Sequence, residues 1–170
     1  MNGEFSVQKR NSVRRGDITY TPTGEGRPCL ATYLDPFPRK IVGWQVSPRI
    51  NENLVIDALD NAVNRENPEE GLMVHMDRGG QYASSGFCRE LENRGLVQSF
   101  SCKGCPCDNA VTESFFKTPK REPPLDRKHD ARIEARQEIF KFIELHCNTR
   151  RPHSSLGNIS PVEYERQCAH

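Results

Sequence analysis

Three acidic residues, Asp17, Asp77 and Glu113, form the set in this sequence that most suggests chemistry. Asp17 lies inside a run of β-forming residues, where Asp is disfavoured because its short side chain competes for backbone hydrogen bonds. Three carboxylates in close contact repel one another strongly unless cations lie between them. Their hard oxygen ligands favour Mg²⁺ or Mn²⁺, so the trio predicts a divalent metal site.

Carboxylates that share two such ions point to phosphoryl transfer. Two ions about 3.5–4 Å apart hold a phosphodiester so that one activates the attacking oxygen and the other stabilises the leaving oxygen. This arrangement requires the strand that carries Asp17 to lie beside the strand that ends before Asp77, with a later helix that brings Glu113 over both. Taken singly, the three residues also have ordinary interpretations, as an edge residue, a turn former and a solvated helix residue.

The elements that would position these carboxylates begin with three β-like runs. They lie at 16–21, 29–35 and 40–47, and turn-rich stretches separate them. Because short connections favour antiparallel pairing, the three runs predict a meander.

Helical and strand-like patterns alternate beyond the meander. The predicted elements are a helix from its N-cap Asn51 to Pro68, a strand at 72–76, a helix at 84–93 and a strand at 96–100. Alternation of this kind favours parallel pairing through right-handed crossovers. The predicted fold class is therefore α/β, a mixed five-stranded sheet with helices on both faces. Two further helices are predicted, from Asp108 to Phe116 and from an Asp130 cap to about Asn148.

The length of 170 residues suits one domain. We expect a flexible basic arm at 1–15, a core at 16–166 and a short tail at 167–170. The chain has no apolar run long enough for a membrane span, and its polar start does not resemble a signal peptide. The seven cysteines are an odd number, which favours reduced thiols, so a cytoplasmic protein is expected.

The net charge is +1, but the charged residues are unevenly distributed along the chain. Residues 1–16 carry +3, residues 17–76 carry −4 and residues 117–170 carry +3. An acidic middle between basic flanks suits a carboxylate site that binds cations, with neighbouring segments that meet phosphate.

Five ordered strings also resemble a known family. They are GDITYTPT (16–23), DPFPRKIVGW (35–44), HMDRGGQYAS (75–84), CDNAVTESFF (107–116) and NTRRPHSSLGNISPVEY (148–164). Together they resemble successive landmarks of DDE transposases of bacterial insertion sequences, in the family typified by insertion sequence three. Thirty-five residues separate Asp77 from Glu113, which is the interval of the acidic triad in that family and in the related retroviral integrases.

The resemblance implies an RNase H-like core in which Asp17, Asp77 and Glu113 bind two Mg²⁺ or Mn²⁺ ions. In such enzymes water attacks a phosphodiester at the transposon end, and the freed 3′-hydroxyl attacks a second phosphodiester. The expected function is thus DNA transposition by metal-dependent cleavage and strand transfer, by a homo-oligomer assembled on DNA.

The same resemblance implies DNA contacts. Lys120 matches the family's basic residue near the cleaved bond, and Asn109 matches the Asn of its DNA motif. From their charge, Arg121, Arg150 and Arg151 are expected to contact phosphate. For His153 two interpretations stay open, a general base and a residue of a tail that caps the core or touches phosphate.

The sequence departs from the family pattern at some positions. Pro119 stands where the family has Leu in a continuing helix, and an interior proline costs about 3 kcal/mol or more, so the helix of Glu113 is expected to stop near Thr118. Only 15 residues precede the core, where relatives carry helix-turn-helix segments. The alternatives are therefore a truncated or inactive remnant that only binds nucleic acid, and a nuclease that hydrolyses without joining.

Two further sets of residues are candidate metal ligands. Cys102, Cys105 and Cys107, with Cys88 or His75 as a fourth ligand, would suggest zinc, but their spacing matches no standard finger, and cysteines without a metal are favoured. Asp35 is a possible fourth ligand for the carboxylate trio, although a turn role before Pro36 is favoured.

Overall fold

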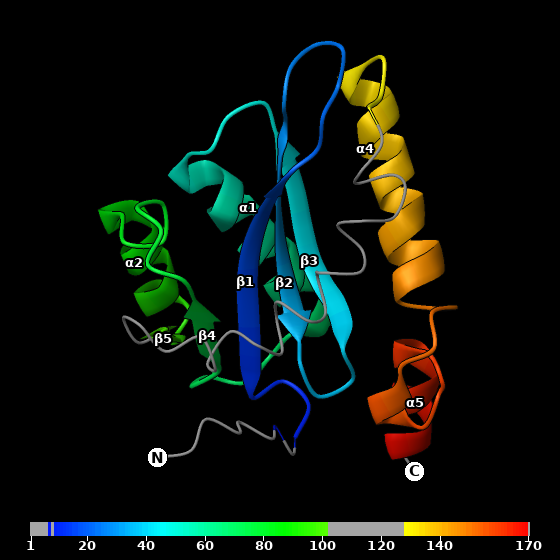
Figure 1. The fold of residues 1–170 in the computed structure, drawn as a ribbon. Helices are drawn as coiled ribbons and strands as arrows, with labels where there is room; N and C mark the ends of the chain where they lie inside the picture. The colour runs from blue at the N-terminus through cyan, green and yellow to red at the C-terminus, as the bar shows by residue number, and fades with distance from the viewer. Residues whose placement is uncertain (1–6, 8, 102–127, 170) are drawn as a thin grey trace.

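A five-stranded mixed sheet forms the centre of the protein. The computed structural model describes residues 7, 9–101 and 128–169. The strands are β1 (Val13–Tyr20), β2 (Cys29–Asp35), β3 (Lys40–Ser47), β4 (Met73–Met76) and β5 (Val97–Phe100), in the order β3-β2-β1-β4-β5. The first three strands pair antiparallel, whereas β4 and β5 continue the sheet parallel to β1 (Figure 1). The predicted sheet is confirmed.

Helices cover both faces of this sheet. They are α1 (Glu52–Glu66), α2 (Ser85–Asn93), α4 (Arg132–Phe140), a π-helical continuation η3 (Lys141–Cys147), a 3₁₀ turn η4 (Ser154–Leu156) and α5 (Pro161–Cys168). In Figure 1, α1 and α2 lie on one side of the sheet and α4 lies on the other. None of the described helices combines the length and the apolar character that crossing a membrane demands.

Strand β2 shows why two cores form. All seven of its residues are buried, and successive side chains point to opposite faces. Ala31 and Tyr33 belong to the core beneath α1 and α2, whereas Leu30 and Leu34 belong to the core beneath α4 and η3. The sheet is therefore a central layer between two helical layers.

Helix α1 begins and ends as its sequence predicts. The Asn51 side chain accepts a hydrogen bond from the Leu54 amide, and the helix stops before Asn67, which adopts a left-handed conformation. The helix lies so close to β3 that a Cβ placed at Gly43 would come within 2.4 Å of the Ala58 carbonyl oxygen. Glycine at this position permits the contact between helix and sheet.

Two predicted boundaries were wrong. Strand β1 begins at Val13, three residues before the predicted start at residue 16, because Val13, Arg14 and Arg15 pair with β4. The last residues of the predicted 1–15 arm therefore belong to the sheet. Asp130 does not cap the long helix. Ala131 holds that position without a side-chain hydrogen bond, and the Asp130 amide donates to Glu134 instead.

Candidate active site

Asp17 and Asp77 belong to two neighbouring parts of the sheet. Strands β1 and β4 are parallel neighbours, with Val13 opposite Met73 and Arg15 opposite His75. The pairing ends there, and a count of two residues beyond it reaches Asp17 in β1 and Asp77 just after β4. The adjacency of strands that the carboxylate site requires is therefore present.

Asp77 stands at the carboxyl end of β4. Its side chain is exposed, and Oδ1 accepts a hydrogen bond of 3.0 Å from the Gly79 amide, which forms the turn after the strand. His75, two residues earlier, hydrogen-bonds Ser99 through Nδ1 and Ser101 through Nε2, at 3.0 and 3.2 Å. These bonds tie the end of β4 to the β5 side of the sheet. The carboxyl ends of parallel strands are the usual place for a ligand in such sheets.

Asp17 is half-buried in the middle of β1, opposite Thr32 of β2. Its electrostatic influence meets that of Asp77 at one buried group, the hydroxyl of Tyr82. Burial raises the pKa of Tyr82 well above its ordinary value, and Tyr33, Asp17 and Asp77 raise it further. Both carboxylates thus raise the pKa of the same buried hydroxyl.

Several predicted site residues fall on parts of the chain outside the described residues. They are Glu113, Asn109, Lys120 and Arg121, together with Cys102, Cys105, Cys107 and Pro119. The two residues suggested as a fourth zinc ligand are described. His75 uses both ring nitrogens on serines, and Cys88 Sγ lies 3.5 Å from Gln98. Within the described ranges, no group of three or more His, Cys, Asp and Glu residues is arranged to hold a metal ion.

His153 and the two arginines before it occupy another part of the molecule. The Arg150 and Arg151 amides both donate to the His146 carbonyl, which closes η3. His153 is 8% exposed and pairs with Ile159. Its electrostatic neighbour Arg39 belongs to the turn between β2 and β3, at the edge where β1 begins. The structure therefore does not bring His153 together with Asp17 and Asp77.

The burial of His153 predicts a pH-dependent stability. Burial, together with the nearby charges of Arg151 and Arg39, lowers its pKa to about 4. Because the unfolded chain takes up this proton near pH 6.5 and the folded chain does not, stability falls as the pH drops from 6.5 towards 4. We expect a loss of about 2 kcal/mol between pH 7 and pH 5, measured by urea unfolding.

His153→Gln is the matched variant for this prediction. It removes the titrating group, so its stability should change little between pH 7 and pH 5. Glu66 does not confound the comparison. Although burial raises its pKa, hydrogen bonds from Lys40 and Arg10 lower the pKa below 4.5 overall, so its contribution is lost at lower pH. An equal pH dependence in both proteins would contradict the assignment to His153.

Asp35 is not part of the carboxylate site. It ends β2 at the opposite edge of the sheet, where it is 1% exposed. Its Oδ2 accepts from Arg14 at 2.6 Å, and its Oδ1 accepts from the Phe37 amide at 3.0 Å. The predicted turn role is confirmed, with a buried ion pair added to it.

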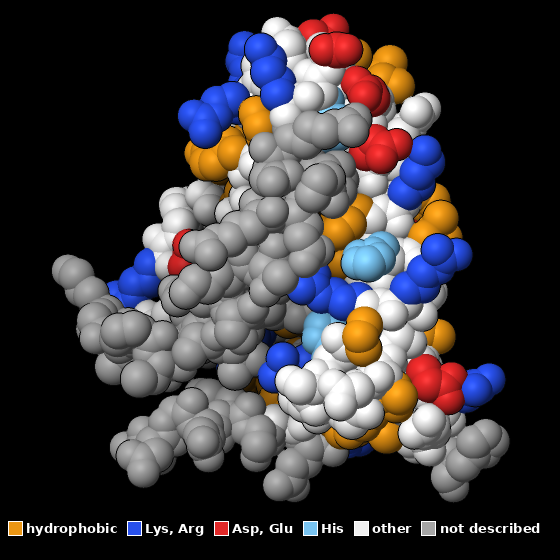
Figure 2. All heavy atoms as spheres, turned by 45° about the vertical axis from the view of Figure 1, so that its right-hand side comes forward, with side chains coloured by type: hydrophobic (Ala, Val, Ile, Leu, Met, Phe, Trp, Pro, Cys, Tyr) orange, Lys and Arg blue, Asp and Glu red, His pale blue; other side chains and the backbone are white. Residues whose placement is uncertain are grey.

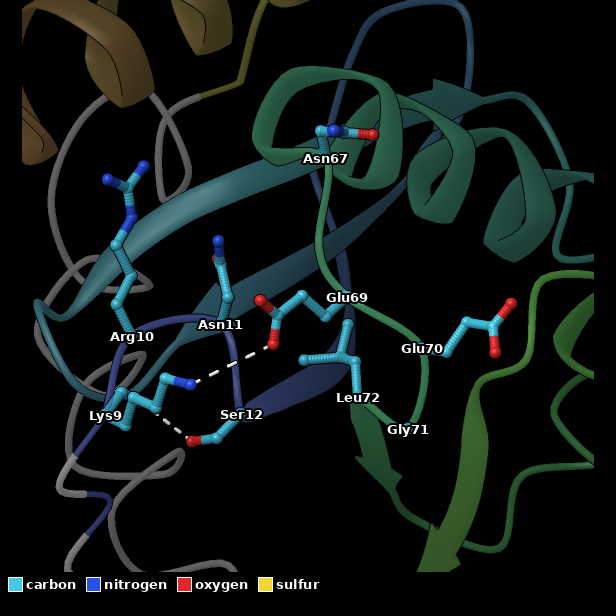
Figure 3. A pocket seen from close by; sticks show the side chains of 9 residues that line it. All are labelled: Lys9, Arg10, Asn11, Ser12, Asn67, Glu69, Glu70, Gly71 and Leu72. Carbon is cyan, nitrogen blue, oxygen red and sulfur yellow. Dashed lines mark hydrogen bonds and ion pairs between the residues drawn. The ribbon is translucent and has the colours of Figure 1, made fainter.

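A hollow of about 480 Å³ lies at that same opposite edge (Figure 3). Its lining comes from the segment before β1 and the segment between α1 and β4, and includes Lys9, Arg10, Glu69 and Glu70. Lys9 and Glu69 form an exposed ion pair of 3.9 Å across it. Because it lies where β1 and β4 begin, the hollow is separate from Asp17 and Asp77.

The described residues on the face that carries α4 are of mixed charge. In Figure 2, the Lys and Arg side chains of the described residues lie in several separate groups, with hydrophobic and acidic side chains between them. Exposed Ile133, Phe140 and Leu145 are among the hydrophobic ones on this helical segment. The charges of the described residues on this face alone therefore do not define a path for a polyanion.

Comparisons with known proteins agree with this architecture. A family model described as integrase core domain matches residues 7–106, and a second model of the same description matches residues 94–161. The chain is 47% identical over 166 residues to the transposase for insertion sequence element IS904 of Lactococcus lactis subsp. lactis (strain IL1403), covering 98% of this chain and 66% of that protein. It is 39% identical over 164 residues to transposase InsF for insertion sequence IS3fB of Escherichia coli (strain K12), covering 96% of this chain and 57% of that protein.

A solved structure shows the same fold at low sequence identity. The HTLV-2 integrase catalytic core domain in complex with magnesium, in its dimeric form, aligns with a TM-score of 0.60 and 15% identity, over 92% of this chain and 96% of that one. The fold of this chain is thus RNase H-like, as expected. The chain spans between 57% and 66% of the length of the two curated relatives.

Proposed function

Because this chain belongs to the integrase core domain family, as its ordered strings predicted, we propose that it is the catalytic core of a DNA transposase. The reaction is phosphodiester cleavage followed by strand transfer, and its place is the bacterial cytoplasm, where the DNA lies. The observation that carries the proposal is the parallel pairing of β1 with β4 up to Arg15 and His75, two residues before Asp17 and Asp77.

The residues of this edge fit a divalent cation. Asp77 is exposed, and only its Oδ1 is engaged by a described residue, so Oδ2 is available as a ligand. Asp17 adds a second carboxylate with the hard oxygens that Mg²⁺ and Mn²⁺ prefer. We propose Glu113 as the third ligand and two ions as the complement. When bound, these ions would activate the attacking oxygen and stabilise the leaving oxygen.

The chain's own residues supply the positions for this chemistry. The Gly79 amide holds the Asp77 carboxylate in one orientation, and the His75 contacts with two serines hold the strand end. No covalent intermediate with the protein is required, since water and then a DNA 3′-hydroxyl attack phosphorus. The partner is DNA, both transposon ends and target, and the active form is a homo-oligomer assembled on it.

The proposed DNA contacts are Asn109, Lys120, Arg121, Arg150, Arg151 and His153. The two arginines that the structure describes allow a direct test. Each neutralised phosphate contributes about −0.9 to the slope of log affinity against log salt. Replacing Arg150 and Arg151 with Ala should flatten that slope by about one to two, measured by fluorescence anisotropy with duplex DNA from 50 to 300 mM salt.

The control for that prediction is Arg89→Ala, which removes an exposed charge on α2, on the other side of the sheet from α4 (Figure 1). It should leave the slope unchanged. If the double arginine variant and wild type give parallel lines, these residues do not contact phosphate.

A strand-transfer assay tests the function itself. Labelled duplexes from the DNA that flanks the coding sequence, pre-cut to expose a 3′-hydroxyl, are incubated with plasmid target and Mg²⁺ or Mn²⁺. We expect label covalently joined to the plasmid, and none when EDTA replaces the metal. Hydrolysis without joining would indicate a nuclease, and binding without turnover would indicate a non-catalytic module; either result contradicts the proposal.

A further inference from the structure

Arg78 carries a positive charge that neither the proposed metal site nor the proposed DNA contacts include. It directly follows Asp77, in the turn after β4, and its side chain is exposed. Its Nε donates a hydrogen bond of 3.3 Å to the carbonyl oxygen of Ser101. Among the residues that the structure describes, no carboxylate forms an ion pair with this guanidinium. Arg78 is therefore a cation next to the carboxylate site that pairs with a backbone group and not with an acid.

The residue that holds Arg78 is itself fixed to the end of β4. The Ser101 amide donates to the Met76 carbonyl at 3.0 Å, and Ser101 Oγ lies 3.2 Å from His75 Nε2. Ser101 directly follows β5, which is the neighbour of β4 on the side away from β1. The Arg78 Nε is thus anchored beside the carboxyl ends of β4 and β5.

The backbone that carries Arg78 is held as well. The Gly79 amide donates to Asp77 Oδ1 at 3.0 Å, and the Tyr82 amide donates to the Gly79 carbonyl at 3.0 Å. The turn closes so tightly that a Cβ placed at Gly79 would come within 2.3 Å of Gln81 Nε2. Arg78 is therefore restrained at its backbone and at its Nε, which lowers the entropy cost of binding a ligand with its remaining donors.

An arginine that is anchored through Nε keeps the donors that recognise phosphate. The guanidinium has N–H groups on Nε and on both Nη atoms, in one planar fork. While the Nε–H is bound to Ser101, the two Nη atoms still present a pair of parallel N–H groups. Such a pair binds two oxygens of one phosphate, whose negative charge would balance that of the arginine.

The strand order places this cation and Asp17 on different sides of β4. Asp17 comes from β1, whereas Ser101, which holds Arg78, follows β5 (Figure 1). A DNA strand that lies across the carboxyl ends of β4 and β5 with one phosphodiester at the carboxylates would place a neighbouring phosphate at Arg78. The geometry therefore gives the arginine a position along the DNA strand that follows directly after the proposed metal site.

We propose that Arg78 binds a phosphate next to the phosphodiester or 3′-hydroxyl that reacts, and so sets the position of the DNA strand on the carboxylate site. The inference rests on the proposed function, since it takes DNA as the substrate and Asp77 as a metal ligand. It adds a contact close to the reacting atoms, whereas Arg150, Arg151 and His153 belong to another part of the molecule.

Joining rates on two kinds of DNA test this proposal. The pre-cut duplex of the strand-transfer assay is used unmodified and as a series in which one phosphate near the 3′-hydroxyl is a neutral methylphosphonate. On unmodified DNA, Arg78→Ala should join about 10–100-fold more slowly than wild type, as expected for the loss of hydrogen bonds to a charged group. One methylphosphonate in the series should slow wild type by a similar factor. The same duplex should slow R78A little further, because the contact is already absent.

The controls are Arg78→Lys and Arg89→Ala. R78K keeps the charge, but an ammonium group cannot bind Ser101 and present a planar pair of donors, so it should recover only part of the rate. R89A removes an exposed charge from α2 and should join at the wild-type rate. Because Arg78 is exposed, R78A should unfold at the same urea concentration as wild type.

The outcomes separate this inference from the proposed function. If wild type joins DNA, Asp77→Asn abolishes joining, and R78A joins within twofold of wild type, the function stands and the role of Arg78 is refuted. If R78A is slow but every methylphosphonate slows it by the same factor as wild type, Arg78 contacts none of these phosphates and the inference also fails. If wild type does not join DNA, or D77N joins it unchanged, the proposed function and the inference fall together.

Discussion

The Asp77→Asn variant should lose metal-dependent strand cleavage and joining by about 10³-fold or more while it keeps its fold. The expected loss corresponds to several kcal/mol of transition-state stabilisation, because the substitution removes the charge of a proposed metal ligand. The amide oxygen of Asn can still accept the 3.0 Å hydrogen bond from Gly79, and the side chain is exposed, so stability should change by less than about 0.5 kcal/mol. Rates from the strand-transfer assay and urea unfolding together check both statements.

Glu69→Gln is the matched control for the loss of one negative charge. Glu69 is exposed and lies at the edge of the sheet where β1 and β4 begin, in an ion pair with Lys9. Its substitution should leave turnover unchanged. Turnover by D77N at the wild-type rate would remove Asp77 from the site and leave the parallel register without a catalytic role.

The second large effect is on stability. Asp35→Asn should lower the free energy of unfolding by about 3–5 kcal/mol, because it leaves the Arg14 guanidinium buried without a counter-charge. Both side chains are only 1% exposed and are joined by a 2.6 Å bond, and Asp35 also accepts from the Asn11 amide at 3.1 Å. The total free energy of unfolding of a domain of this size is about 5–15 kcal/mol. The unfolding transition of D35N should therefore move to a much lower urea concentration.

A double variant separates the buried charge from other effects of the substitution. Arg14→Met together with Asp35→Asn removes both charges, and the Asn oxygen can still accept backbone hydrogen bonds. We expect the double variant to be more stable than D35N alone. A D35N protein that unfolds at the wild-type urea concentration would show that the pair adds nothing. A double variant that is less stable than D35N would show that the arginine matters for packing.

Some features of this protein follow from short stretches of sequence. The Asn51 cap, the ends of β2 and β3 and the helical apolar spacing of α1 depend on neighbours within a few residues, so local patterns predicted them. The Arg14 and Arg15 pairing was missed because two arginines near a polar start resemble a solvated arm. Their partners, Asp35 and the β4 backbone, lie far along the chain.

The candidate site also has a part that the sequence predicts and a part that depends on the tertiary structure. Residue types and the ordered strings were enough to select Asp17 and Asp77 and to predict the family, because the chemistry of a carboxylate is carried by the side chain itself. Whether these two residues lie near each other depends on β1 and β4 pairing in parallel across some sixty residues, a long-range register that no local pattern encodes. Sequence alone thus determined which groups are available, and tertiary packing decided which of them meet.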